Sequence, residues 1–137
     1  QLSRGLGDVY KRQVLIDAPC SSTGTIQKNP DIKWTASEET LLKHLELQRQ
    51  LLDEGARILK PGGTLIYSTC SLEMEENQNQ VESFLARHTG FFMKKRPSDS
   101  AFFELDDWTN EDHSFFQILT GSKWGGFFGA AISSDHA

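Results

Sequence analysis

Cysteine is scarce in this sequence, and long apolar runs are absent. The 137 residues include only two cysteines, Cys20 and Cys70, and the start of the sequence lacks the charged-then-apolar pattern of a signal peptide. No apolar run approaches the ~20 residues that span a bilayer. Two cysteines without an export signal are typical of a reducing compartment, so we expect a cytoplasmic protein without a membrane partner.

Positive charge is also in short supply. The sequence has 14 Lys+Arg against 19 Asp+Glu, a formal net charge of −5. An autonomous nucleic-acid binder is usually basic, so this balance counts against strong independent binding of RNA or DNA. The local cluster Lys94–Arg96 is typical of a solvated surface turn. None of the four histidines has the spacing of a metal ligand, so we assign no metal.

The length suits one domain or part of one, and a globule of this size buries a core without help from metals or disulfides. Residues 1–13 show neither a helical stripe nor strand alternation, and we expect an atypical or foreign N-terminal segment there. The glycines of this segment lack the preceding strand and following helix of a phosphate-binding loop. The folded domain is predicted over residues 14–132, followed by a tail at 133–137.

A strand–helix–strand pattern opens this domain. Val14–Ile16 forms a short apolar strand, and a capping box of Thr35 and Glu38 marks the start of a helix. The sequence Lys60–Gly63 ends that helix, and Thr64–Tyr67 forms the second strand. Because such a crossover is almost always right-handed, the two strands are predicted to lie parallel. The apolar stripe of the helix consists of Leu41, Leu45, Leu52, Ala56 and Leu59.

The second half continues with a helix and a closing pair of strands. A helix is predicted over residues 72–88, ending before Gly90, with an inner face of Val81, Phe84, Leu85 and His88. Residues 94–112 are polar and irregular. The apolar runs Phe115–Leu119 and Phe127–Ile132 are expected to pair antiparallel. This order of elements indicates an α/β fold.

Cys20 and Cys70 each follow the C-terminal end of a predicted strand. Parallel strands end at the same rim of a sheet, which is where open α/β sheets bind ligands, so the two thiols should be neighbours in space. Three uses fit such thiols: a nucleophile with a partner, a redox pair, or buried structural cysteines. The absence of a Cys-x-x-Cys spacing disfavours the redox pair.

The two motifs around these cysteines are specific. The segment Asp17–Gly24 reads DAPCSSTG and Ser68–Ser71 reads STCS, and together they resemble the RNA (cytosine-C5) methyltransferase family. The resemblance is greatest to the bacterial 16S ribosomal RNA type of this family, the Sun or Fmu type, and it covers about residues 14–132. Further similar segments are Asn29–Trp34, Leu59–Leu65 and Gly126–Phe128.

This resemblance implies a Rossmann-like, S-adenosylmethionine-dependent methyltransferase fold, of which residues 14–132 would be the C-terminal portion of the catalytic domain. It also implies a mostly parallel sheet with a closing antiparallel hairpin. The cofactor would be S-adenosyl-L-methionine and the partner ribosomal RNA, and we expect a monomer. The glycine-rich cofactor loop of the family belongs upstream of the first strand and is absent from this sequence. An inactive fragment or an accessory RNA-binding module is therefore the alternative to an active enzyme.

The resemblance assigns the chemistry to the two thiols. Cys70 would add to carbon 6 of cytosine, which makes carbon 5 enamine-like and able to take a methyl group from a sulfonium donor. Cys20 would help to release the product when the covalent adduct collapses. DNA cytosine methyltransferases use the Pro-Cys thiol as the nucleophile instead, and the second thiol at Cys70 favours the RNA type.

Other residues near the motifs are candidate contacts. Asp17 would hydrogen-bond the ring nitrogen 3 and the amino group of cytosine and lie at the methionine end of the cofactor, or else cap its loop. Pro19 would stiffen the loop beside the cofactor. Trp34 is expected to pack rather than to contact RNA. The substrate RNA is assigned Ser21, Lys28 and Lys33, while Ser22 and Thr23 either contact phosphate or cap the loop.

Overall fold

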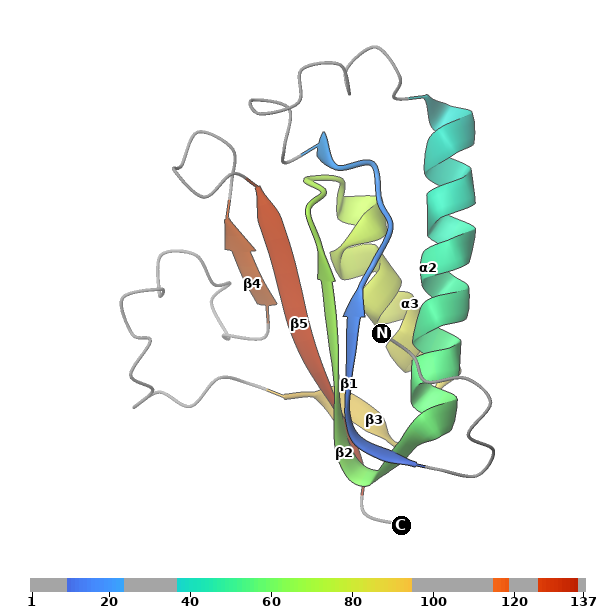
Figure 1. The fold of residues 1–137 in the computed structure, drawn as a ribbon, viewed down its shortest axis with the longest axis vertical. Coiled ribbons are helices and arrows are strands. Elements are labelled where there is room, and N and C mark those ends of the chain that lie inside the picture. Colours follow the sequence, from blue (N-terminus) through green and yellow to red (C-terminus); the bar gives the residue numbers. More distant parts are fainter. Residues whose placement is uncertain (1–9, 24–36, 95–114, 119–125, 136–137) are drawn as a thin grey trace.

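The computed structural model describes residues 10–23, 37–94, 115–118 and 126–135. Figure 1 shows a twisted sheet with the helices on the same side of it. This arrangement confirms the α/β fold class. The elements in chain order are β1 (Lys11–Asp17), α2 (Glu38–Ile58), β2 (Leu59–Thr69), η2 (Met74–Glu76), α3 (Gln78–Arg87), β3 (Phe91–Met93), β4 (Phe115–Ile118) and β5 (Phe127–Ser134).

The sheet has the strand order β1-β2-β5-β3, and β4 pairs with β5 beside this path. Strands β1 and β2 are parallel, as predicted, with Val14 opposite Leu65 and Asp17 opposite Ser68. Strands β2, β3 and β4 all pair antiparallel with β5. Among the described strands β5 therefore runs against the other four. The described sheet is therefore mixed, with β1/β2 as its parallel pair, and the expected closing antiparallel pair of β4 and β5 is confirmed.

Both parallel strands are longer than the sequence pattern predicts. Strand β1 begins at Lys11 rather than Val14, so the last residues of the expected atypical segment belong to the sheet. Strand β2 begins at Leu59 and includes the Pro-Gly-Gly turn that was expected to precede it. Between Lys11 and Gln13 the partners advance from Leu59 to Thr64, five residues against two, so three extra residues of β2 form an irregularity. Strand β5 likewise runs on to Ser134, inside the expected tail.

The start of α2 differs from the prediction. Ser37, and not Thr35, is the N-cap: its Oγ accepts a hydrogen bond from the backbone N–H of Thr40 at 3.1 Å. Ser37 caps as well as Thr does, and this start puts Glu38 and Glu39 in the first turn, where the helix dipole favours negative charge. Thr35 itself lies outside the described residues. The helices of the described chain include none that is long and apolar enough to cross a membrane.

The second predicted helix is divided in two at Asn77. The 3₁₀ helix η2 ends at Glu76, and α3 begins at Gln78. Asn77 is non-helical, with φ −112° and ψ −104°. Its buried side-chain amide forms hydrogen bonds with Thr69 and Ser71 of the preceding loop, and these bonds favour a conformation outside the helix. On the inner face Val81 and Phe84 are buried as predicted, Leu85 packs at the margin of the core, and His88 stacks on the Phe84 ring at 4.4 Å.

The short strand β3 was not predicted. It follows Gly90, whose φ of +89° is a left-handed conformation that glycine adopts without strain. The three residues of β3 pair with the C-terminal end of β5, where Met93 lies opposite Ile132. Three residues are too few to show the alternation of a strand in the sequence. The strand conformation of β3 therefore depends on its pairing with β5.

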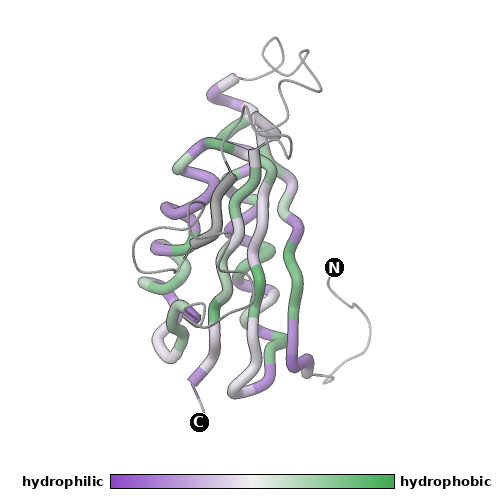
Figure 2. The backbone as a smooth tube through the Cα atoms, turned by 90° about the vertical axis from the view of Figure 1, so that its left-hand side faces the viewer, coloured by the Kyte–Doolittle hydropathy of each residue, from purple (hydrophilic) through white to green (hydrophobic). Residues whose placement is uncertain are grey.

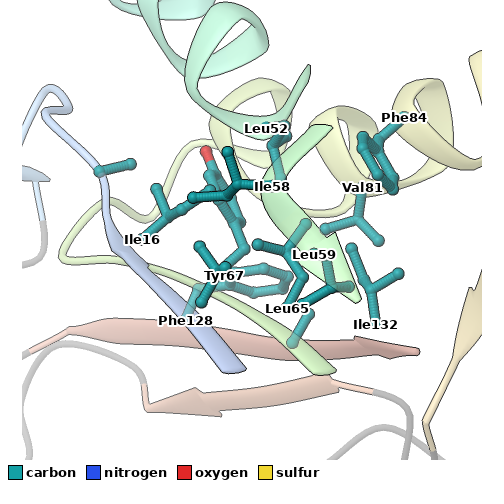
Figure 3. Close-up of a cluster of buried hydrophobic side chains, with 13 residues drawn as sticks. Ile16, Leu52, Ile58, Leu59, Leu65, Tyr67, Val81, Phe84, Phe128 and Ile132 are labelled. Atoms are coloured by element: carbon teal, nitrogen blue, oxygen red, sulfur yellow. The ribbon is translucent and has the colours of Figure 1, made fainter. Parts of the chain in front are cut away.

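The core lies between the sheet and the two helices (Figure 3). Alternate residues of the strands point at α2 and α3, whereas Leu15 on the other face of β1 is 53% exposed. Gly55 lets α2 approach closely, since a Cβ there would lie 2.9 Å from Leu65 Cδ1. Figure 2 shows the strands as mostly apolar or neutral and the helices as alternately polar and apolar. The buried side chains include Val14, Ile16, Leu52, Ile58, Leu65, Tyr67, Val81, Phe84, Phe128 and Ile132.

Candidate active site

The two cysteines meet at the C-terminal edge of the parallel strands. After Asp17 the ladder continues for one more residue, because Ala18 N–H donates to the Ser68 carbonyl at 2.9 Å. The segments that follow β1 and β2 then leave the sheet at the same end, at the top of Figure 1. Cys20 Sγ and Cys70 Sγ lie 3.4 Å apart, and both are free, half-buried thiols. The predicted convergence of the two thiols is confirmed.

The two thiols have opposite acidities. The hydrogen bond from Cys20 to Cys70 is the largest influence on Cys70 and lowers its pKa to about 6. Burial opposes this shift, and the hydrogen bond with Ser22 adds a smaller lowering. The bond between the two thiols, together with burial, raises the pKa of Cys20 above its usual range. At neutral pH the pair therefore consists of a Cys70 thiolate and a Cys20 thiol that donates to it. A thiolate is the nucleophilic form of cysteine, so the geometry activates Cys70.

Ser22 reaches both sulfur atoms. Its Oγ lies 3.3 Å from Cys70 Sγ and 3.9 Å from Cys20 Sγ. Ser22 has a φ of +58°, which is uncommon for a residue other than glycine. This backbone conformation aims the hydroxyl at the thiol pair rather than at solvent. From the sequence, Ser22 was expected either to contact phosphate or to cap the loop. In the structure its hydroxyl contacts the two thiols.

Thr23 ties the loop of Cys20 to the loop of Cys70. Its Oγ1 accepts a hydrogen bond from Leu72 N–H at 2.8 Å and lies 3.5 Å from Ser71 Oγ. Thr23 was expected either to contact phosphate or to cap its own loop. In the structure it caps a backbone N–H group of the neighbouring loop instead. The hydroxyl groups of residues 22 and 23 thus hold the two cysteine loops together.

A buried glutamate behind the cysteines was missed by the sequence reasoning. Glu76 is 0% exposed and accepts hydrogen bonds from Ser21 N–H at 3.0 Å and from Ser71 Oγ at 2.5 Å. A third donor is Gln48 Nε2, at 2.9 Å. Buried carboxyl groups are rare unless they are paired. Glu76 therefore links Ser21 and Ser71, the residues that directly follow the two cysteines.

Gln48 is the second residue that was missed. It is fully buried, and its Nε2 also donates to the Pro19 carbonyl at 2.8 Å. Its Oε1 accepts from Gln80 Nε2 at 3.2 Å. A signal was present in the sequence: Gln48 falls on the apolar stripe of the helix, between Leu45 and Leu52, at a position where a polar residue must have a partner.

The remaining predicted site residues divide into three groups. Asp17 and Pro19 are exposed at the sheet edge. The negative charge of Asp17 slightly opposes the lowering of the pKa of Cys70. Ser21 is half-buried, with its N–H bonded to Glu76. Lys28, Lys33 and Trp34 lie outside the described residues. Within the described residues no group of three His, Cys, Asp or Glu side chains is placed to hold a metal ion.

Comparison with known proteins places the chain in context. A family model described as "16S rRNA methyltransferase RsmB/F" matches residues 2–133. A curated relative from Salmonella newport, named ribosomal RNA small subunit methyltransferase B, is 45% identical over 131 residues, which is 95% of this chain and 28% of the relative. The chain therefore spans little more than a quarter of that relative.

Two solved structures have a similar fold. The crystal structure of PH0851 has a TM-score of 0.75 and 35% identity, and the match covers 88% of this chain and 26% of that one. The crystal structure of NSun6 from Pyrococcus horikoshii with SFG has a TM-score of 0.73 and 20% identity, over 94% of this chain and 31% of that one. In both structures the sheet and helices described above match a part of a longer chain.

Proposed function

The chain belongs to the family of 16S rRNA methyltransferases RsmB/F, and from this premise we propose that it carries the catalytic thiols of a cytoplasmic enzyme that methylates carbon 5 of cytosine in 16S ribosomal RNA. S-adenosylmethionine is the proposed methyl donor. The observation that supports the proposal is the pair of sulfur atoms 3.4 Å apart with opposite acidities. A buried structural cysteine would need neither the second thiol nor the lowered pKa.

Cys70 is the proposed nucleophile. Its thiolate adds to carbon 6 of the target cytosine, and the electron pair moves into the ring so that carbon 5 becomes nucleophilic. When bound, S-adenosylmethionine supplies an electrophilic methyl group. A base in a duplex cannot reach a thiol at the edge of a sheet, so the cytosine has to leave its stack. The half-buried position of Cys70 suits a reaction with an extruded base.

Cys20 is the proposed partner for product release. Once Cys70 is bonded to carbon 6 it carries no negative charge, so the main influence that raises the pKa of Cys20 is gone. Cys20 can then lose its proton to solvent and, as a thiolate, remove the hydrogen from carbon 5. The bond between Cys70 and carbon 6 breaks, and the departing Cys70 thiolate again accepts a hydrogen bond from the Cys20 thiol.

Asp17 and Pro19 are the proposed contacts to the cofactor from this chain. Both are exposed beside the thiol pair, and a carboxylate there complements the positive charge of a sulfonium group. Asp17 would also accept from the cytosine amino group as charge develops in the ring. The proposed RNA contacts are Ser21, Lys28 and Lys33.

The test uses the full-length protein that carries this chain, with S-adenosylmethionine and a 16S ribosomal RNA fragment. Cys70→Ala should abolish methyl transfer, whereas Cys20→Ala should accumulate a protein–RNA adduct that survives denaturing electrophoresis. Bisulfite sequencing of the RNA identifies the methylated atom as carbon 5. Normal turnover of Cys20→Ala without an adduct would refute the division of labour between the thiols.

A calorimetric titration with S-adenosylmethionine separates the enzyme from its alternative, an accessory RNA-binding module or inactive fragment. Heat of binding at sub-millimolar cofactor supports the enzyme. RNA binding without any heat from the cofactor supports the accessory module, because a module of this kind needs no methyl donor.

A further inference from the structure

Two buried side chains outside the cysteine motifs, Gln48 of α2 and Glu76 of η2, contact each other at 2.9 Å. Each also bonds the chain next to a catalytic thiol. Gln48 donates to the Pro19 carbonyl, just before Cys20, and Glu76 accepts from Ser21 N–H, just after it. The backbone on both sides of Cys20 is therefore held by one hydrogen-bonded pair.

Glu76 of this pair also holds the chain beside Cys70. Ser71 Oγ donates to Glu76 Oε1, and it accepts a hydrogen bond from Glu73 N–H at 2.9 Å. The Tyr67 hydroxyl, from the end of β2, donates to the Glu76 backbone carbonyl at 2.7 Å. The carboxyl group of Glu76 thus joins the loop of Cys20 to the loop of Cys70, and its backbone is fixed to the strand that leads to Cys70.

Burial makes this arrangement selective for one geometry. Gln48 and Glu76 are both 0% exposed, so water cannot replace a lost partner, and a buried polar group without a partner costs about 1–3 kcal/mol. Gln80 fixes the far side of Gln48 by donating to its Oε1, and it also donates to the Leu45 carbonyl at 2.8 Å. The pair is therefore held from behind as well as from the two loops.

We propose that Glu76 and Gln48 are positioning residues, which hold the sulfur atoms of Cys20 and Cys70 at hydrogen-bonding distance. The catalytic consequence rests on the proposed function, whereas the geometric part concerns the thiols alone. A hydrogen bond weakens steeply with distance, so a small shift of either loop would remove the bond that keeps Cys70 ionised. Neither residue touches the reacting atoms, and their effect passes through Pro19, Ser21 and Ser71.

The test measures the pH at which alkylation of Cys70 by iodoacetamide reaches half its maximum. Glu76→Gln keeps the shape of the side chain but turns an acceptor oxygen into a donor that faces other donors. We expect the midpoint to rise by about one pH unit and kcat/KM with RNA to fall about tenfold or more, since misplacement by 1 Å can cost as much as a hundredfold. Glu75→Gln is the matched control, because Glu75 is adjacent in the same 3₁₀ helix and exposed, and it should change neither quantity.

Ser71→Ala is the second variant, which decides the matter if Glu76→Gln fails to fold. It removes the hydroxyl that joins Glu76 to the loop of Cys70 and leaves the carboxyl group with its other two donors. We expect a smaller rise of the same midpoint, by about half a unit. The titratable groups around the thiols, which the analysis of the curve has to include, are Asp17, His44, Tyr67 and Glu76.

The outcomes separate the two proposals. A raised midpoint in folded Glu76→Gln or Ser71→Ala, with Glu75→Gln unchanged, supports the positioning role whatever the wild-type protein does to RNA. Unchanged midpoints in both folded variants would overturn it. If the midpoint rises but the wild-type full-length protein methylates no RNA, the proposed function fails and the positioning role stands.

Discussion

The two cysteine loops lie at the same edge of one sheet, yet they are held in different ways. The loop of Cys70 is anchored by its own segment: Thr69 Oγ1 donates to Asn77 Oδ1 at 2.6 Å, and Asn77 Nδ2 donates to the Ser71 carbonyl at 2.9 Å. The loop of Cys20 is held mainly by side chains from distant elements, Gln48 and Glu76. The thiol proposed to attack the base thus has a local, buried framework, and its partner is placed by remote contacts.

This difference has an energetic meaning. Thr69 and Asn77 are both 0% exposed, so their hydrogen bonds belong to the folded core and not to the surface. Pro19, in contrast, is exposed and Cys20 is half-buried, although Gln48 and Glu76, which hold their loop, are themselves buried. The framework of Cys70 comes from its own segment of the chain, whereas the buried side chains that hold the Cys20 loop belong to other elements, so local opening of those elements would affect Cys20 first. The predictions below test this contrast.

The largest effect is expected on stability. Asn77→Ala leaves the Thr69 hydroxyl and the Ser71 carbonyl without their buried partners, which costs about 2–6 kcal/mol at about 1–3 kcal/mol for each unpaired group. Urea denaturation should show this as a lower midpoint at an unchanged slope. The control is Asn79→Ala on the exposed side of α3, expected within about 0.5 kcal/mol of the wild type. Equal effects of the two substitutions would contradict a core-anchored loop of Cys70.

The second prediction concerns the reactivity of the thiols. Because the pKa of Cys70 is lowered to about 6, the thiolate fraction and hence its alkylation rate should rise about tenfold between pH 5 and pH 7 and then level off. The alkylation of Cys20, whose pKa is raised, should still be increasing above pH 9. Mass spectrometry of the two cysteine peptides after brief exposure to iodoacetamide measures both curves. A single shared curve would mean that the thiols are not differentiated.

Much of this site could be predicted from the sequence. The strand–helix–strand pattern implied parallel strands, and that topology alone brought Cys20 and Cys70 to one edge. The elements that were misplaced depend on tertiary contacts. The second helix breaks at Asn77 because its amide bonds Thr69 and Ser71, and local helical spacing contains no information about those partners.

The positioning pair could be predicted only in part, because the position of Gln48 indicates that it needs a partner but does not identify Glu76 as that partner. In the sequence Gln48 interrupts the apolar stripe of the helix. Glu75 and Glu76 are adjacent acids that the sequence does not distinguish, and only the fold shows that Glu76 is buried whereas Glu75 is exposed. The helix start at Ser37 instead of Thr35 is a local ambiguity, because both residues are good caps. The RNA contacts proposed at Lys28 and Lys33 stay predictions, since they lie outside the described residues.

The third prediction tests the bond between the thiols. Cys20→Ala removes the largest influence that lowers the pKa of Cys70, so the midpoint of Cys70 alkylation should rise by about one unit toward the ordinary thiol value near 8.5. Cys20→Ser retains a hydroxyl donor and should produce a smaller rise. An ultraviolet titration of the Cys70 thiolate near 240 nm provides an independent measurement. An unchanged midpoint in Cys20→Ala would show that the proximity of the two sulfurs has no electrostatic consequence.

The smallest effect is expected at Ser22, where the hydroxyl and the backbone can be tested separately. Removing the Oγ that lies 3.3 Å from Cys70 should raise the alkylation midpoint of Cys70 by about half a unit, less than Cys20→Ala does, because Ser22 ranks below Cys20 among the influences on that pKa. Ser22→Ala and Ser22→Gly should shift the midpoint equally, since both lack the hydroxyl. Only Gly suits the φ of +58°, so Ser22→Gly should be the more stable variant by up to about 1 kcal/mol in urea. If the two variants differ in midpoint but not in stability, the backbone conformation, and not the hydroxyl, sets the acidity of the thiol.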